Sequence, residues 1–321
     1  MEKKDLRIVF MGTPDFAVAS LQAIRESGYA VAGVVTAPDR EAGRGKKVKF
    51  SAVKEYALKH DLKILQPEKL KNEQFIDELA SLKADLQVVV AFRMLPEIVW
   101  NMPPLGTFNL HASLLPQYRG AAPINHALIN GEKVTGVTTF FLDKEIDTGR
   151  IIDRVEVPVF EDDDFGTLHD RLMEAGAKLV VDTIEKIRTG TVTPIDQASL
   201  VKPGEVLHPA PKIFKEFCEI NWHRKAEEVY NFIRGLSPYP GAYTYFNIED
   251  GGQLMVKIFK TEYEEVPHNA IPGSVMRNGD QIKIAAADGY IDIKELQAPG
   301  KKRMSAGDFL RGFHQNILSA G

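Results

Sequence analysis

The chain has 321 residues, 44% of them hydrophobic, which is enough for two domains with separate cores. The single cysteine, Cys218, excludes an internal disulfide and a cysteine-based zinc site, and it fits a reducing, cytoplasmic environment. The formal net charge of −4 gives no overall attraction to nucleic acid, so an RNA contact would need a local basic patch. No apolar run approaches the length of a membrane helix, and the N-terminus does not read as a signal peptide.

Continuous apolar runs alternate with segments of helical spacing in the first half of the chain. The runs cover residues 6–10, 30–36 and 86–92, and the helical segments begin at Phe16 and cover residues 51–60 and 74–82. Strands that are apolar throughout are buried on both faces, so this pattern predicts an α/β fold with a doubly wound, mostly parallel sheet. The first turn reads GTPDFA and lacks the G-x-G-x-x-G pattern, which disfavours a nicotinamide-dependent dehydrogenase.

The pattern changes in the second half. Two β-branched runs at 134–142 and 150–159 predict a hairpin at the sheet edge, and a long amphipathic helix is expected over 165–188. We place a catalytic domain at 1–190, a polar linker at 191–207 and a second domain at 208–321. This last part combines a helical segment with five short strands, at 243–248, 253–259, 273–276, 281–287 and 290–297, and therefore predicts a small OB-like β-barrel.

Three polar residues are the candidate catalytic group. Asn109 and His111 are two positions apart, so both side chains would lie on one face of an extended segment at a sheet edge where α/β proteins bind ligands. An amide donor and an imidazole that converge on one point can stabilise the oxyanion formed in acyl transfer. Asp147, in the segment LDKEIDTG, would orient the imidazole or accept a proton from an attacking amine.

The sequence offers no group for covalent or metal-assisted catalysis. It contains no G-x-S-x-G motif, and Cys218 lies in the second domain, away from the candidate group. An HExxH motif is missing, and the eight histidines are scattered along the chain, so no metal is expected. Direct transfer of an acyl group is the reaction we expect.

The segments NLHASLLPQYRGAAPIN and LDKEIDTGRII resemble the folate-dependent formyltransferase family. The resemblance implies a Rossmann-like catalytic domain, 10-formyltetrahydrofolate as formyl donor, and Asn109, His111 and Asp147 as catalytic residues. It also implies a folate site lined by a further set of residues, namely Ser113, Leu114, Leu115, Pro116, Phe92, Arg93, Leu95 and Asp143.

Within that family the resemblance is greatest to members that formylate methionyl initiator tRNA for translation initiation, and it runs through both halves of the chain. It includes IVFMGTPDFAV, PDREAGRGKK, IRGLSPYPGAY and LQAPGKKRMSAGDFL. It implies tRNA contacts by basic residues of two segments, namely Arg40, Arg44, Lys46, Lys47, Lys301, Lys302 and Arg303. Nothing in the sequence indicates an assembly larger than a monomer.

One segment departs from the family pattern. Residues 91–96 read AFRMLP, where a glycine is expected at the position of Arg93 and the loop is one residue shorter. Arginine adopts the positive-φ conformation of glycine less easily, so we expect the backbone of this folate loop to follow a different path.

Two alternatives use the same residues differently. A related enzyme could formylate a sugar-nucleotide amine or hydrolyse formyl-folate, although the extra domains expected of some such enzymes are missing from 321 residues. A second alternative is a non-catalytic RNA-binding module, and the intact set Asn109, His111 and Asp147 argues against it.

Overall fold

The computed structural model describes residues 2–42 and 47–321, without the side chains of residues 41, 42, 47 and 48. The chain forms two compact units, and each is built from three separate segments. Unit 1 contains residues 1–120, 134–158 and 169–209, and unit 2 contains residues 121–133, 159–168 and 210–321. The boundaries predicted at 190 and 208 assume contiguous domains and stay a prediction.

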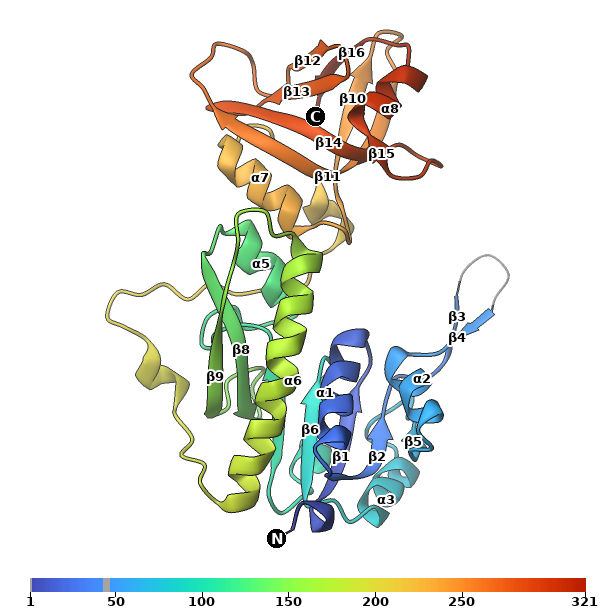
Figure 1. Cartoon of the computed structure of the whole chain (residues 1–321), viewed down its shortest axis with the longest axis vertical. Coiled ribbons are helices and arrows are strands. Elements are labelled where there is room, and N and C mark those ends of the chain that lie inside the picture. The colour runs from blue at the N-terminus through green and yellow to red at the C-terminus, as the bar shows by residue number, and fades with distance from the viewer. Residues whose placement is uncertain (1, 43–46) are drawn as a thin grey trace. The chain divides into compact units, whose positions relative to one another are not determined.

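Unit 1 is an α/β unit with a seven-stranded sheet in the order β5-β2-β1-β6-β7-β8-β9 (Figure 1). The strands are β1 (Arg7–Gly12), β2 (Ala30–Val35), β5 (Ile64–Leu65), β6 (Leu86–Val90), β7 (Thr107–His111), β8 (Val134–Phe141) and β9 (Ile151–Pro158). The first five are parallel to one another, and β8 and β9 add to the edge as an antiparallel hairpin. The doubly wound, mostly parallel sheet and its edge hairpin are as the sequence predicts.

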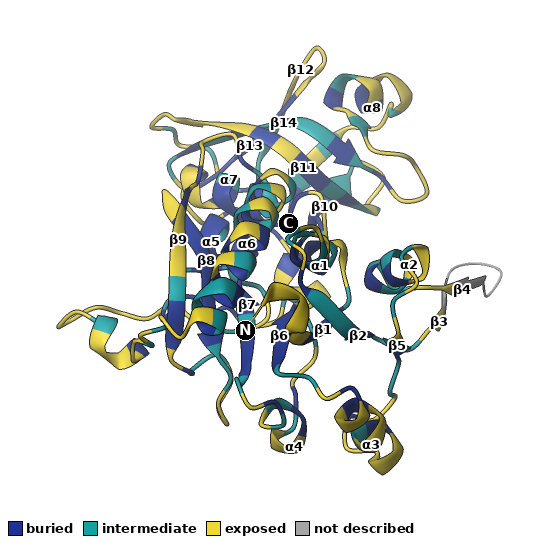
Figure 2. Cartoon of the chain, turned by 60° about the horizontal axis from the view of Figure 1, so that its bottom comes forward, coloured by how far each residue is buried: buried dark blue, intermediate teal, exposed yellow. Residues whose placement is uncertain are grey.

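Helices pack on both faces of this sheet. They are α1 (Asp15–Glu26), α2 (Ala52–Lys59), α3 (Glu73–Ser81), α4 (Glu97–Trp100) and α6 (Phe165–Thr189), and a short 3₁₀ turn η1 (Lys3–Asp5) precedes the sheet. Val9, Val89 and Phe75 belong to one core cluster, which joins the sheet to α3 and α4. On the other face a Cβ added to Gly176 of α6 would lie 2.7 Å from a Leu110 methyl group, so glycine permits this close approach. The inner strand β6 is accordingly buried along its whole length (Figure 2).

A short hairpin, β3 (Arg40–Ala42) and β4 (Lys47–Lys49), precedes α2. Its base is anchored by two contacts: the Asp39 carboxylate pairs with Lys54 Nζ at 2.5 Å and accepts a hydrogen bond from Gln66 Nε2 at 2.8 Å. The Ser51 hydroxyl then caps α2 by accepting from the Lys54 backbone amide at 3.0 Å. The hairpin base therefore has a fixed attachment to unit 1.

Unit 2 contains an antiparallel sheet in the order β12-β13-β14-β11-β10-β16, with β15 paired to β14. A bridge between Ser274 and Ser319 connects its two ends and nearly closes it into a barrel. The strands are β10 (Ala242–Ile248), β11 (Gln253–Glu265), β12 (Val275–Asn278), β13 (Gln281–Ala285), β14 (Gly289–Gln297), β15 (Met304–Ser305) and β16 (Ile317–Ala320). The helices are α5 (Pro123–Ile129), α7 (Ala226–Gly235) and α8 (Ala306–Gly312), with the 3₁₀ turn η3 (Lys215–Cys218). The predicted barrel-like second fold is confirmed.

Candidate active site

Asn109 and His111 lie on β7, an inner strand of unit 1. The strand pairs with β6 in parallel, with Asn109 opposite Val89 and Leu110 opposite Val90. Alternation along β7 places the side chains of Asn109 and His111 on one face and that of Leu110 on the other, against α6. His111 is 6% exposed and Asn109 is half-buried. The sheet thus presents an amide and an imidazole side by side at the carboxyl end of a parallel strand, as the spacing predicts.

Both nitrogens of the His111 ring face a defined partner. Nε2 lies 2.8 Å from the backbone oxygen of Tyr118, which can only accept, so Nε2 carries a hydrogen and donates it. Nδ1 lies 3.9 Å from Asp147 Oδ2, which is within range for an ion pair when the ring is protonated but too long for a hydrogen bond. The Asp147 carboxylate therefore faces the ring nitrogen that is not bonded to Tyr118.

Asp147 is held in place by hydrogen bonds to its carboxylate and to its backbone oxygen. Its φ of 55° lies in the left-handed region, which aspartate tolerates better than most residues. The Gly120 amide donates to Oδ2 at 3.0 Å, and the Gln197 side-chain amide donates to the Asp147 backbone oxygen at 2.9 Å. Gln197 is 1% exposed and lies within the segment predicted as a linker. The sequence analysis did not identify Gln197. It lies in a polar segment 50 positions after Asp147, and no motif in that segment indicates a contact with the site.

The four residues Ser113 to Pro116 follow β7 closely in the chain and are mostly buried. The Ser113 hydroxyl donates to the Gln117 backbone oxygen at 2.6 Å, and Leu115 belongs to a buried cluster with Phe140 and Ile151. Ser113, Leu115 and Pro116 are buried, and only Leu114 is half-buried. Their role as folate contacts stays a prediction, and the structure assigns them packing contacts.

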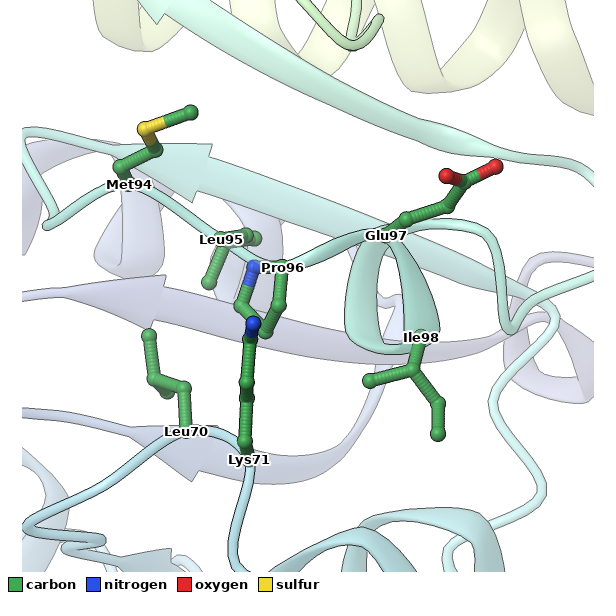
Figure 3. A pocket seen from close by; sticks show the side chains of 7 residues that line it. All are labelled: Leu70, Lys71, Met94, Leu95, Pro96, Glu97 and Ile98. Atoms are coloured by element: carbon green, nitrogen blue, oxygen red, sulfur yellow. The ribbon is translucent and has the colours of Figure 1, made fainter.

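The predicted folate loop borders an open apolar pocket with a volume of about 570 Å³. Figure 3 shows its lining residues, which are Leu70, Lys71, Met94, Leu95, Pro96, Glu97 and Ile98. The loop leaves β6 at the same sheet edge at which β7 ends with His111. Of the eight residues predicted for folate, Leu95 lines this pocket. Phe92 is half-buried beside the core cluster, and Asp143 is exposed.

Arg93 does not occupy the conformation expected of the glycine it replaces. The left-handed residue of this loop is Ala91, with φ 47°, and Arg93 is not in that region. The Arg93 guanidinium donates to the backbone oxygens of Glu68, at 2.8 Å, and of Pro67. Its side chain therefore ties the folate loop to the segment that precedes α3.

The basic residues predicted to contact tRNA fall in both units. Arg40 is exposed at the hairpin base, Arg44 and Lys46 lie outside the described residues, and the side chain of Lys47 is not described. Lys301 and Lys302 are exposed in unit 2. Arg303 forms an ion pair with Glu295 and lies over the Phe259 ring at 4.7 Å, so its charge is partly neutralised. Contact with RNA stays a prediction for all of them.

No group of three or more His, Cys, Asp and Glu side chains in the described parts of the chain could hold a metal ion. Within the same residues, no helix is long and apolar enough to cross a membrane.

Comparison with known families agrees with this fold. Residues 6–184 match the family model described as formyl transferase, and residues 212–314 match the model described as formyl transferase, C-terminal domain. The chain belongs to the formyl transferase family, whose members use folate.

Its curated relatives include methionyl-tRNA formyltransferases. That of Bacteroides fragilis is 56% identical over 315 residues, covering 98% of this chain and 97% of the relative. That of Flavobacterium johnsoniae is 50% identical over 312 residues and covers 97% of both.

Solved structures share the fold at low sequence identity. HypX from Aquifex aeolicus in complex with tetrahydrofolic acid has a TM-score of 0.62 and 18% identity, over 95% of this chain and 46% of that protein. WlaRD, a sugar 3N-formyl transferase, has a TM-score of 0.61 and 21% identity, over 92% and 99% of the two chains.

Proposed function

We propose that this enzyme transfers the formyl group of 10-formyltetrahydrofolate to the amino group of methionine carried on initiator tRNA, for translation initiation in the cytoplasm. The observation that carries the chemistry is the placement of Asn109 and His111 on one face of β7, with Asp147 beside the free ring nitrogen. The near full-length identity with methionyl-tRNA formyltransferases supports the choice of acceptor.

The proposed transfer is direct. The neutral amine attacks the formyl carbon, the carbonyl becomes an oxyanion, and the bond from that carbon to N10 of the folate breaks. The amine loses one proton and N10 gains one, so protons balance without a cofactor. An α-amine with a pKa near 7.7 is roughly a sixth to a half unprotonated at cellular pH, so a strong base is not required.

The chain's own groups stabilise the charge that develops. The Asn109 amide and a proton on His111 Nδ1 are the donors available to the oxyanion. Tyr118 holds the opposite nitrogen and so fixes the ring orientation. Asp147 stabilises the charged imidazole across 3.9 Å. The apolar pocket beside Leu95 supports placing the aromatic part of the folate next to this group.

The test is transfer of radiolabelled formyl from 10-formyltetrahydrofolate, with charged initiator tRNA, uncharged tRNA and a sugar-nucleotide amine as parallel acceptors. We expect label on the charged initiator tRNA alone. Label on the sugar-nucleotide amine, or release of free formate, would retain the folate chemistry and reject the proposed acceptor.

Substitution of the donors tests the catalytic assignment. Asn109→Ala and His111→Ala should each lower kcat by ~10²-fold or more, because each removes an oxyanion donor. Asn101→Ala, an exposed asparagine at the end of α4, is the matched control and should keep the wild-type rate. Near wild-type rates in both donor variants would contradict the assignment.

A further inference from the structure

We propose that Gln197 is a positioning residue for the transfer reaction, which acts by holding Asp147 beside His111. The proposal rests on the proposed function only in taking Asp147 as a member of the catalytic group. Among the described residues, the Gln197 side chain hydrogen-bonds to Asp147, Gly149 and Arg119, and not to the His111 ring or the pocket residues.

The Gln197 side chain makes four hydrogen bonds in a buried setting. Its Nε2 donates to the backbone oxygens of Asp147, at 2.9 Å, and of Gly149, at 2.8 Å. Its Oε1 accepts from Arg119 Nε at 3.0 Å and from Arg119 Nη2 at 2.6 Å. Two carbonyls on one side and two N–H groups on the other leave a single orientation for the amide.

These contacts join three separate parts of unit 1 around the carboxylate. Arg119 directly precedes Gly120, whose amide donates to Asp147 Oδ2 at 3.0 Å. The bridge between Ile151 and Ile195 brings the segment that carries Gln197 alongside the segment that carries Asp147. The Gln197 amide therefore fixes the Asp147 backbone directly. Through Arg119 it also supports the neighbouring Gly120, whose amide holds the Asp147 carboxylate.

The position of Asp147 needs such support. Its backbone is left-handed, which costs free energy unless the surroundings hold it there, and its carboxylate is useful only while it lies near Nδ1. Displacement of a catalytic group by about 1 Å can lower a rate by ~10²-fold. Loss of the Gln197 donors should therefore lower kcat, while the binding of both substrates is preserved.

Gln197→Glu is the sharpest test because it keeps the size of the side chain and its contact with Arg119. It replaces the amide donor with an oxygen that faces two carbonyl oxygens. We expect kcat to fall by ~10-fold or more, with KM for folate and for the acceptor within about twofold of wild type. Gln74→Glu, an exposed glutamine on α3, is the control and should leave all three constants unchanged.

A double-mutant cycle separates positioning from a general structural effect. If Gln197 acts through Asp147, then Gln197→Glu should lower the rate little further, by about twofold at most, in an Asp147→Asn background. An additive loss in that background, or a wild-type kcat in the single variant, would overturn the proposal. Should Gln197→Glu fail to fold, Gln197→Met removes the same donors without a charge and carries the same cycle.

The outcome does not depend on the identity of the acceptor. Any amine that the wild-type enzyme formylates can serve as the substrate in the cycle. If the wild-type enzyme does not formylate methionyl-tRNA, the proposed function is refuted. The role of Gln197 can then still be tested by the same double-mutant cycle with the amine that the enzyme does formylate.

Discussion

At the residue scale, a hydrogen-bonded triad of Tyr29, Glu185 and Arg188 in unit 1 makes the stability of the protein depend on pH. The Tyr29 hydroxyl donates to Glu185 Oε2 at 2.6 Å, and the same carboxylate pairs with Arg188 at 2.5 Å. The hydrogen bonds from Arg188 and then Tyr29 lower the pKa of Glu185 to about 2. Burial, and then the hydrogen bond with Glu185, raises the pKa of Tyr29 to about 12.

The lowered pKa of Glu185 predicts a loss of stability in acid. Folding favours the charged carboxylate, so its contribution is present above the ordinary pKa of about 4.5 and is lost as the pH falls toward about 2. The urea midpoint of the wild type should therefore fall more steeply with acid than that of Glu185→Gln, starting near the ordinary pKa. Glu55→Gln, on the exposed side of α2, is the control. Parallel midpoint curves for wild type and Glu185→Gln would refute this prediction.

At the scale of elements, the β3–β4 hairpin begins with two cations in register. Arg40 lies directly opposite Lys49, and like charges in that position destabilise a strand pair. Neither makes an ion pair with another described side chain, because the nearby Asp39 carboxylate is engaged by Lys54 and Gln66. A repulsive pair on an anchored base suits contact with an anion such as an RNA phosphate.

Lys49→Gln tests this interpretation, which extends the predicted tRNA contacts by one residue. We expect KM for charged tRNA to rise several-fold, while KM for folate and kcat stay constant. The slope of the tRNA binding constant against salt concentration, on logarithmic axes, should decrease by about one, as expected for the loss of one phosphate contact. Lys59→Gln, exposed on α2, should change none of these values. An unchanged salt dependence in Lys49→Gln would exclude a phosphate contact at this position.

Most elements could be predicted from local pattern, and the exceptions share a physical cause. The buried strands β1, β2 and β6 and the long helix α6 carry strong periodicity, and the structure places them as expected. The helices α4 and α5, of four and seven residues, are too short to show a helical period. Similarly, spacing alone indicated the pair Asn109 and His111, whereas Gln197 reaches Asp147 through a contact 50 positions apart that no local pattern encodes.

At the scale of the whole molecule, unit 2 is not a contiguous C-terminal piece. Arg234 of α7 is 6% exposed and donates to the backbone oxygens of Phe160, at 3.0 Å, and Asp163, at 3.1 Å. The Asn125 side chain of α5 donates to the Gly235 backbone oxygen at 2.7 Å. Three segments separated in sequence are therefore joined around the end of α7.

Arg234→Met should destabilise the protein by about 3 kcal/mol, because it removes two hydrogen bonds that the charged guanidinium donates to backbone oxygens, each worth about 1.5 kcal/mol or more. Urea unfolding measures this loss. Arg277→Met is the control, because Arg277 is exposed and its hydrogen bond to the Leu310 backbone oxygen is long at 3.5 Å. Equal stability of the two variants would show that Arg234 does not hold the segments together.

The same organisation predicts the fate of the piece 208–321 expressed alone. That piece would lack α5 and residues 159–168, so the Arg234 guanidinium would lose its carbonyl partners. Gly235 would also face water, because it packs closely on Ile129 of α5; a Cβ added to it would lie 2.8 Å from that side chain. The barrel core around Phe246 and Ile291 would remain, so we expect secondary structure without a sharp thermal transition. Circular dichroism in the far and near ultraviolet distinguishes the outcomes. A cooperative transition at the temperature of the full chain would mean that the barrel, rather than the three joined segments, sets the stability of unit 2.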